Sequence, residues 1–323
     1  MRKVLILGGA GYIGSVTSAQ FKDRGYIPIV VDNLSQGSKN IVKDVKLYRL
    51  DINKENLQYV FDKEGSIDGI IHFAGLIQVG ESMKDPSLYI RSNICTGVDI
   101  LDFMKENNIK NIVFSSSAAV YGNPKRVPIK EGDIKKPINV YGFTKYSYEK
   151  ILRFYDQIFG IKSVSLRYFN AAGASEKYKI GEAHKKETHL IPLIIKGILN
   201  NNEFTVYGNT YDTKDGSCIR DYIHVNDLAN AHVLALEYLI NNEKSNIFNL
   251  GANKGYSIFE IIKEVENVTG KKVNFSIGDK REGDPSILIA DFEKAKNTLL
   301  WEPKYSITDI ISSAYSYHKN YEN

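Results

Sequence analysis

Short apolar runs alternate with longer amphipathic segments through the first half of the chain. Apolar residues recur at helical spacing in three longer segments, which cover residues 12–24, 86–106 and 141–159. The short runs, each compatible with a buried strand, cover residues 4–7, 27–31, 46–50, 69–73, 111–114 and 163–166. Strands that alternate with helices in this way are typical of βαβ units. The pattern therefore predicts a parallel sheet with helices on both of its faces.

This alternation weakens after residue 170. Residues 171–186 have the composition of a loop. Helical spacing returns later, around Pro192 and over residues 225–240 and 257–269. We therefore expect a main domain over residues 1–169 and a smaller α/β domain over residues 170–323, which can return elements to the first sheet.

Composition and charge exclude several classes of protein. Lys and Arg total 42 and Asp and Glu total 38, a net charge of +4 without a dense basic block, so a nucleic-acid or membrane-surface partner has little support. No apolar run approaches the roughly 18 residues that a membrane span requires. Cys95 and Cys218 cannot build a disulfide framework, and neither cysteine has metal-ligand spacing with a histidine. We expect a cytoplasmic protein without a metal.

A glycine-rich stretch, Gly8-Gly9-Ala10-Gly11-Tyr12-Ile13-Gly14, follows the first predicted strand and opens a helix. Such glycines let the backbone approach a pyrophosphate, whose charge the helix N-terminus favours. The spacing alone also occurs in purely structural turns. Asp32, however, ends the second predicted strand about 20 residues further on, where a carboxylate accepts hydrogen bonds from the adenosine ribose. Because this carboxylate would repel a 2′-phosphate, we expect NAD rather than NADP.

A serine run and a Tyr-x-x-x-Lys pair follow the fifth predicted strand. On a helix, the spacing of Tyr141 and Lys145 places the phenol and the ammonium on one face. A phenol has a pKa near 10, and a nearby ammonium together with the positive nicotinamide ring would lower that pKa. Tyr141 can then take a proton from a substrate hydroxyl, while Ser117 holds the reacting oxygen and Lys145 also reaches the nicotinamide ribose.

A second pair with the same spacing, Tyr146 and Lys150, competes with this assignment. On one helix it would point about 140° away from the first, so only one of the two pairs can face a cofactor. Tyr141 is preferred because it lies at the expected start of the helix, just after a possible cap at Asn139. Spacing alone leaves the choice open.

Taken together, the sequence resembles the extended short-chain dehydrogenase/reductase family, and within it the hexose 4-epimerases. The matching stretches cover nearly the whole chain, at residues 8–15, 72–76, 79–82, 114–122, 167–170, 220–225 and 281–284. The glycine loop and the Tyr-x-x-x-Lys pair are common to the superfamily, whereas the combination of the stretches at 72–76, 79–82 and 220–225 is more specific to 4-epimerases. The resemblance implies a Rossmann-type doubly wound parallel sheet, the cofactor NAD and a homodimer.

The resemblance also implies a role for individual residues. It makes Ser117, Tyr141 and Lys145 catalytic. It places at NAD the residues Gly8, Gly11, Tyr12, Ile13, Gly14, Asp32, Asn33, Asp51, Ile52, Phe73, Ala74, Gly75, Asn93, Tyr141 and Lys145. It places at the UDP-sugar the residues Ser117, Tyr141, Asn170, Leu190, Tyr207, Arg220, Arg281 and Asp284. Guanidinium groups suit a diphosphate, and a tyrosine can stack on uracil.

The implied reaction is the reversible interconversion of UDP-glucose and UDP-galactose, a step of galactose metabolism. NAD-dependent oxidation at C4 would give a 4-keto sugar, which rotates and is reduced from its other face.

Three positions depart from the family pattern or leave the substrate open. Ile77 stands where the family often has a lysine at the pyrophosphate, and His189 stands where many members have an asparagine. Leu288 is intermediate in size at the position associated with admitting N-acetylated hexoses.

Other functions remain as alternatives. UDP-GlcNAc/UDP-GalNAc and UDP-uronate 4-epimerases would use the same scaffold. A sugar-nucleotide 4,6-dehydratase needs an added acid and base after the serine motif, where this chain has Ala118 and Ala119. A redox-sensing protein that has lost catalysis should lack the serine or the Tyr-x-x-x-Lys pair, and this chain has both.

Overall fold

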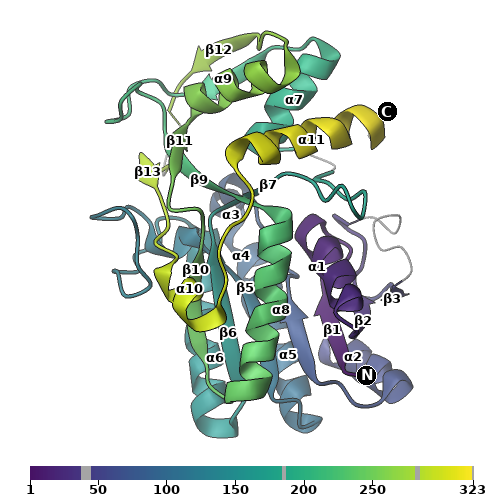
Figure 1. The fold of residues 1–323 in the computed structure, drawn as a ribbon. Coiled ribbons are helices and arrows are strands. Elements are labelled where there is room, and N and C mark those ends of the chain that lie inside the picture. The colour runs from purple at the N-terminus through teal and green to yellow at the C-terminus, as the bar shows by residue number, and fades with distance from the viewer. Residues whose placement is uncertain (38–44, 184–186, 281–283, 322–323) are drawn as a thin grey trace.

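Seven parallel strands form the main sheet, in the order β10-β6-β5-β4-β1-β2-β3 (Figure 1). The computed structural model describes residues 1–37, 45–183, 187–280 and 284–321. The strands of the main sheet are β1 (Lys3–Leu7), β2 (Ile27–Val31), β3 (Lys46–Tyr48), β4 (Gly69–His72), β5 (Asn111–Ser117), β6 (Lys162–Tyr168) and β10 (Asn246–Leu250).

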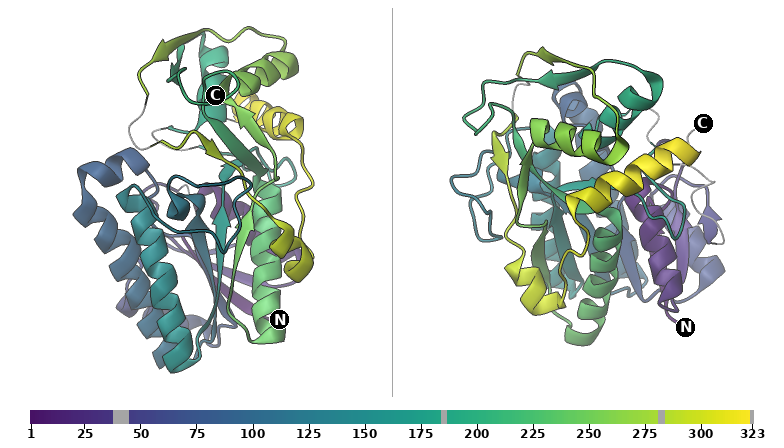
Figure 2. Two further views of the ribbon diagram at one scale, coloured as in Figure 1. Left: turned by 90° about the vertical axis from the view of Figure 1, so that its left-hand side faces the viewer. Right: turned by 45° about the horizontal axis from the view of Figure 1, so that its top comes forward.

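Alternate residues of the central strands supply two separate cores. Val4 and Ile6 of β1 face one apolar cluster, whereas Leu5 and Leu7 face another. One face is covered by α1 (Tyr12–Asp23), α8 (Val225–Asn242) and α10 (Glu293–Leu299). The other is covered by α2 (Lys54–Glu64), α5 (Thr96–Glu106) and α6 (Val140–Phe159), as the edge-on view in Figure 2 shows. The predicted α/β class with a doubly wound parallel sheet is confirmed.

The strand order reverses between β1 and β4. From β1 the chain builds outward through β2 and β3 on one side, and through β4, β5 and β6 on the other. Ligands of such sheets bind outside the carboxyl ends of the strands at this switch point. The loops that follow β1 and β4 therefore mark the expected cofactor crevice.

The second half of the chain builds a smaller layer beyond those strand ends (Figure 1). Its larger sheet contains β7 (Asn170–Ala172), β9 (Ile219–His224), β11 (Gly255–Ser257) and β13 (Ile287–Leu288). A two-stranded sheet pairs β8 (Phe204–Tyr207) with β12 (Phe275–Gly278). Helices α7 (Leu190–Asn200), α9 (Ile258–Thr269) and α11 (Ile307–Tyr321) pack on these strands around a third apolar cluster.

Residues 225–250 join the two layers. Helix α8 packs on α1, and strand β10 pairs in parallel with β6 at the edge of the main sheet. The second half of the chain thus contributes a helix and a strand to the first layer. The boundary at residue 170 stays a prediction.

Several element predictions need correction. The single helix expected over residues 86–106 consists of α4 (Pro86–Ile90), a π-helical turn (Arg91–Cys95) and α5. Strand β5 continues through Ser117, so the serine run ends the strand instead of following it. Helices α2, α3 (Val79–Lys84), α10 and α11 were not expected from the pattern.

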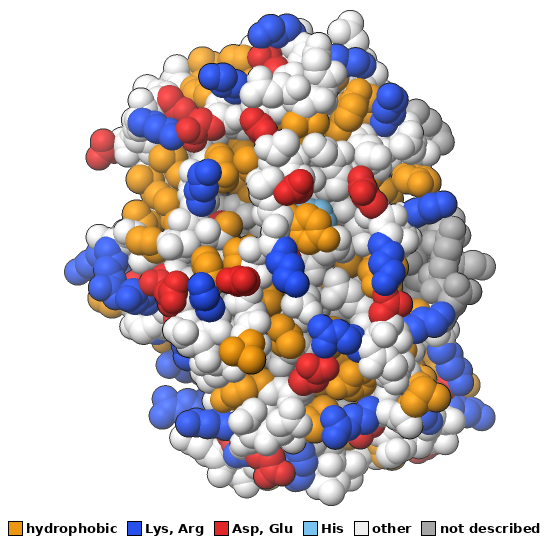
Figure 3. All heavy atoms as spheres, in the orientation of Figure 1, with side chains coloured by type: hydrophobic (Ala, Val, Ile, Leu, Met, Phe, Trp, Pro, Cys, Tyr) orange, Lys and Arg blue, Asp and Glu red, His pale blue; other side chains and the backbone are white. Residues whose placement is uncertain are grey.

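The surface mixes charge signs. On the face drawn in Figure 3, lysine and arginine side chains are interspersed with aspartate and glutamate. Among the helices of the described ranges, none is long and apolar enough to cross a membrane.

Candidate active site

The glycine loop connects β1 to α1 at the switch point. Gly11 is the N-cap residue of α1, and Tyr12 and Ile13 begin the helix, where backbone N–H groups have no acceptor within the helix. A Cβ on Gly14 would lie 2.5 Å from the carbonyl oxygen of Gly8, so the helix and the loop approach too closely for any side chain there. This cradle of backbone N–H groups fits a pyrophosphate. The Tyr12 hydroxyl donates to the carbonyl oxygen of Gly173, which ties the loop to the second layer.

Asp32 lies directly after β2 and is 8% exposed. Its carboxylate accepts hydrogen bonds from the backbone N–H of Ala10 (3.0 Å) and of Leu34 (2.8 Å). Next to it, the side-chain amide of Asn33 donates to Asp51 (2.9 Å) at the end of β3. Three residues predicted to contact NAD thus meet beyond neighbouring strand ends, and a fourth, Ile52, packs beside the second apolar cluster.

Asn93, in the π-helical turn, holds the loop that follows β4. Its Oδ1 accepts from the N–H of Leu76 (2.8 Å), and its Nδ2 donates to the Leu76 carbonyl (3.0 Å) and to Thr144 Oγ1 (3.1 Å). The π turn inserts one residue into the helix and lets this buried amide reach both neighbours. Asn93 therefore fixes the loop of Phe73, Ala74 and Gly75 against α6. Its direct contact with NAD stays a prediction.

Helix α6 brings Tyr141 to Ser117. The predicted cap is present, since Asn139 Oδ1 accepts from the N–H of Gly142 (2.8 Å). A Cβ on Gly142 would lie 2.5 Å from the carbonyl oxygen of Ala119, so the first turn of α6 packs directly on the turn that follows β5. Burial raises the pKa of Tyr141, and its hydrogen bond with Ser117 opposes that increase.

Lys145 lies one turn after Tyr141 and is 2% exposed. Its Nζ donates to the carbonyl oxygen of Ser115 (2.9 Å) and lies 5.7 Å from the centroid of the Tyr141 ring. Burial lowers the pKa of Lys145 to about 8. Burial, with a smaller contribution from the Lys145 charge, lowers the pKa of His72 to about 3, so this neighbouring imidazole stays neutral at physiological pH.

The second Tyr-x-x-x-Lys pair, Tyr146 and Lys150, lies in a different environment from that of Tyr141 and Lys145. Lys150 is exposed and stands 5.0 Å above the Tyr146 ring, and that ring packs against the apolar cluster around Tyr121 and Phe169. The geometry favours Tyr141 and Lys145, which lie at the carboxyl end of β5 with their polar ends near the serine run.

The structure brings together three of the residues expected at the UDP-sugar. Arg220, in β9, is 8% exposed; it donates to the Ile219 carbonyl (2.8 Å) and forms an ion pair with Asp284. Tyr222, two residues further along β9, lies in the field of that pair and hydrogen-bonds with Asn170. Leu190 begins α7, and Tyr207 ends β8 with 40% of its surface exposed. Arg281 lies outside the described residues.

The structure also locates the three residues at which the sequence departs from the family pattern or leaves the substrate open. Ile77 follows the loop after β4 and is 43% exposed. Leu288, in β13, packs against the apolar cluster that contains Tyr121 and Phe169. His189 is the N-cap residue of α7, and its ring contacts the carboxylate of Glu182. Together with Glu187 these two groups bring ligand atoms within 4.8 Å of one another, a grouping that is common without an ion.

Sequence reasoning missed residues that support the site from behind. Ser82 accepts from the backbone N–H of Tyr141 (3.1 Å), which explains part of the stretch at residues 79–82. Glu149 and Arg167 form a buried ion pair next to the serine run. A charged residue at the end of an apolar strand, as at Arg167, was the available indication.

A dinucleotide loop at the switch point, with a serine, a tyrosine and a lysine gathered at a neighbouring strand end, defines the class of short-chain dehydrogenase/reductase enzymes. Residues 4–251 match the NAD dependent epimerase/dehydratase family, and the chain belongs to this family.

Individual relatives narrow the resemblance. The chain is 46% identical over 322 residues to the UDP-glucose 4-epimerase of Lacticaseibacillus casei, and the alignment covers 98% of this chain and 97% of that protein. The crystal structure of UDP-glucose 4-epimerase from Brucella ovis in complex with NAD matches with a TM-score of 0.94 at 41% identity, over 98% of both chains. The enzyme from Bifidobacterium longum in complex with NAD+ and UDP matches with a TM-score of 0.94 at 38% identity, over 99% of both chains. The resemblance noted in the sequence is confirmed.

Proposed function

We propose that this chain interconverts UDP-glucose and UDP-galactose with NAD as a resident cofactor. The observation that carries the proposal is the meeting of Ser117, Tyr141 and Lys145 at the end of β5, beside a glycine loop built for a dinucleotide. Relatives named UDP-glucose 4-epimerase that align over nearly the whole chain support the same reaction.

The residues at the switch point fit NAD. The close approach at Gly14 and the unpaired first turn of α1 suit the pyrophosphate, and Asp32 suits the adenosine ribose. Lys145 would contact the nicotinamide ribose. When bound, NAD supplies the acceptor and donor of hydride for carbon C4 of the sugar.

Tyr141 and Ser117 carry the proton of the C4 hydroxyl. The hydrogen bond from Ser117 and the ammonium of Lys145 both favour the phenolate form of Tyr141, against the cost of burial. Tyr141 accepts the hydroxyl proton as C4 is oxidised, and it returns a proton as the ketone is reduced from the other face. Over one turnover, Tyr141 therefore returns as many protons to the sugar as it accepts, and no net proton leaves the site.

Anchoring of the nucleotide lets the sugar turn. Arg220 offers a guanidinium to the diphosphate, with Asp284 and Asn170 close to it. If the diphosphate is held firmly, the 4-keto sugar stays near the nicotinamide site while it rotates about its bond to the nucleotide.

Two groups of rival reactions differ in their support. UDP-N-acetylhexoses and UDP-uronates remain candidate substrates, because Leu288 is intermediate in size at the position that the family resemblance associates with admitting N-acetylated hexoses. A dehydratase reaction has little support, since Ala118 and Ala119 follow Ser117 and cannot transfer protons.

We also propose a homodimer in the cytoplasm. Helix α6 exposes two large apolar side chains, with Phe154 59% and Ile158 66% exposed, and a second copy of α6 could cover them. Cys95 and Cys218 are not joined by a disulfide, as expected in a reducing compartment. Sedimentation equilibrium tests the dimer: a mass that stays at 36.4 kDa would contradict it.

A substrate panel tests the reaction. Purified protein, supplied with NAD but no NADH, is mixed separately with UDP-galactose, UDP-GlcNAc and UDP-glucuronate, and products are separated by chromatography. We expect UDP-glucose from UDP-galactose at the highest rate. If no UDP-sugar is converted, the proposal is wrong.

A further inference from the structure

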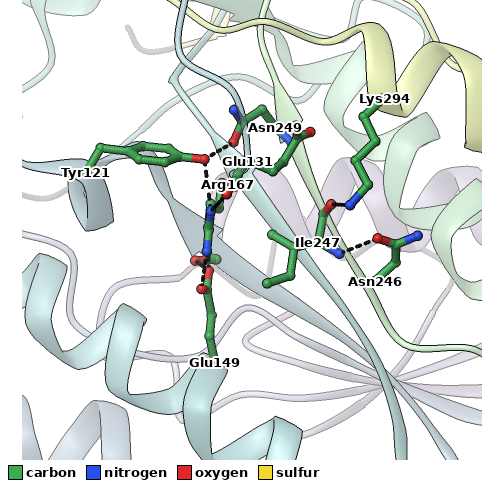
Figure 4. Close-up of polar contacts among 9 residues, drawn as sticks. Tyr121, Glu131, Glu149, Arg167, Asn246, Ile247, Asn249 and Lys294 are labelled. Atoms are coloured by element: carbon green, nitrogen blue, oxygen red, sulfur yellow. Dashed lines mark hydrogen bonds and ion pairs between the residues drawn. The ribbon is translucent and has the colours of Figure 1, made fainter. Parts of the chain in front are cut away.

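A buried ion pair lies between strand β6 and helix α6 (Figure 4). Arg167 donates from Nε to Glu149 Oε1 (2.8 Å) and from Nη2 to Oε2 (2.5 Å), and the two side chains are 1% and 3% exposed. Removing two charges from water has a free-energy cost that their attraction often fails to repay, so stability alone does not account for the pair.

Glu149 also binds the strand that carries Ser117. The hydroxyl of Ser116, which is fully buried, donates to Glu149 Oε1 (2.6 Å). One helical turn earlier, Lys145 donates to the carbonyl oxygen of Ser115 (2.9 Å). Helix α6 is therefore attached to the end of β5 at two successive residues, and these attachments fix both its rotation and its position along the strand.

The other end of the guanidinium holds the turn that follows Ser117. Arg167 Nη1 donates to the hydroxyl of Tyr121 (2.9 Å), and that hydroxyl donates to Asn249 Oδ1 (2.6 Å) on β10, as Figure 4 shows. Tyr121 ends the short helical turn Ala118–Tyr121 that starts directly after Ser117. The segment from residue 116 to residue 121 is thus held on both sides of Ser117.

We propose that Glu149 and Arg167 are positioning residues for the reaction, which through Ser116 and Tyr121 set the Ser117 hydroxyl against the Tyr141 hydroxyl. The inference rests on the proposed function, because it assigns these two hydroxyls to proton transfer. A positioning role differs from a purely structural role in one respect. A change that weakens the contacts of Glu149 and Arg167 should alter the Ser117–Tyr141 hydrogen bond even where the protein remains folded.

Ser116→Ala is the most selective test. It removes the bond between β5 and Glu149 and leaves the ion pair intact, whereas Glu149→Gln would leave a buried guanidinium without its counterion. Ser313→Ala is the matched control, because Ser313 is 6% exposed and lies in α11, and its hydroxyl is also hydrogen-bonded. It donates to the Ile310 carbonyl (3.0 Å), accepts from the N–H of Ala174 (3.1 Å) and contacts the His224 ring (3.2 Å). We expect Ser116→Ala to lower kcat for UDP-galactose by at least about tenfold with KM changed less than about twofold, and Ser313→Ala to change neither.

Titration of Tyr141 gives a second readout that needs no turnover. In protein labelled at the tyrosine Cζ carbons, the Tyr141 signal is assigned by its loss in Tyr141→Phe. Weakening the bond from Ser117 should raise the pKa of Tyr141 in Ser116→Ala and leave it unchanged in Ser313→Ala. If the wild-type protein does not epimerise UDP-galactose, the proposed function fails, while this titration still tests the pair. An unshifted Tyr141 signal, or a kcat no lower than that of Ser313→Ala, would overturn the positioning role.

Discussion

The two layers of the molecule prepare their polar groups in different ways. Around the end of β5, the groups assigned to chemistry are already hydrogen-bonded within the chain, Ser117 with Tyr141 and Lys145 with the Ser115 carbonyl, and Lys145 is also buried. In the second layer, Tyr207 is 40% exposed and Asn170 lies at the surface, and the buried guanidinium of Arg220 is held by Asp284. The comparison indicates that the proposed reacting groups are preassembled, whereas we predict that recognition of the UDP-sugar requires side chains of the second layer to exchange partners when it binds.

Removing the Tyr141 hydroxyl takes away the proposed proton acceptor of the preassembled layer and should have the largest effect on kcat. We expect Tyr141→Phe to lower kcat by roughly 10²–10⁴-fold while the affinity for UDP, measured by calorimetry, stays unchanged. Tyr146→Phe, in the rival pair on the same helix, is the matched control and should retain most activity. Equal losses in the two variants would contradict the choice of Tyr141.

Arg220→Gln tests the recognition layer. Loss of a charged contact to the diphosphate should raise KM for UDP-galactose by about 10–100-fold with a smaller change in kcat. Steady-state kinetics measure both constants. Arg24→Gln, which removes an exposed arginine that pairs with Glu237, is the control and should change neither. A fall in kcat with KM unchanged would indicate that Arg220 acts in the chemical step and does not bind the diphosphate.

Lys145→Met separates stability from activity in the preassembled layer. Burial lowers the pKa of Lys145 from 10.5 to about 8, so between these pH values the unfolded chain binds more protons than the folded one. The cost of burying the ammonium is therefore full below about pH 8 and fades as the pH rises toward about 10.5. We expect the variant to lose activity and to gain roughly 1–3 kcal/mol in free energy of unfolding near pH 7, with a smaller gain near pH 10.

Urea unfolding at the two pH values measures this gain. Lys150→Met is the control, because Lys150 is exposed and its removal should change the free energy of unfolding little at either pH. A variant at Lys145 that is destabilised equally at both pH values would show that the buried charge has no such cost.

Leu288→Ala should have the smallest effect, on substrate choice alone. A shorter side chain beside Tyr121 and Phe169 makes room for an N-acetyl group, so the ratio of kcat/KM for UDP-GlcNAc to that for UDP-glucose should rise about three- to tenfold. Competition between the two substrates, with products separated by chromatography, measures the ratio. An unchanged ratio would remove Leu288 from substrate selection.

The sequence predicted those parts of the molecule whose interactions are local or periodic. The apolar run of β1, the glycine loop and the cap at Asn139 follow from patterns a few residues long, and the structure has each of them. The return of β10 to the main sheet was not predicted specifically, because its five residues, Asn246–Leu250, include two asparagines and interrupt the apolar pattern.

The contacts of the residues that support the site from behind could not be predicted from such local patterns. Glu149 and Arg167 lie on different elements, and their pairing depends on how α6 docks on the sheet. Asn93 reaches Leu76 only because a π turn interrupts the helix, which residue spacing does not predict. The roles of Tyr141 and Lys145 were preferred over those of Tyr146 and Lys150 on position alone, and the structure adds two physical reasons, the hydrogen bond of Tyr141 with Ser117 and the burial of Lys145.

Retention of isotope at C4 tests the central claim most directly, namely that the C4 carbon–hydrogen bond is broken and remade within one closed site. UDP-galactose carrying deuterium at C4 is converted in ordinary water, and the UDP-glucose formed is analysed by mass spectrometry and proton NMR. The account predicts that the deuterium stays at C4 of the product and that none enters the solvent. Loss of the label to solvent would contradict transfer through a bound cofactor and would point to a reaction that removes the C4 hydrogen as a proton.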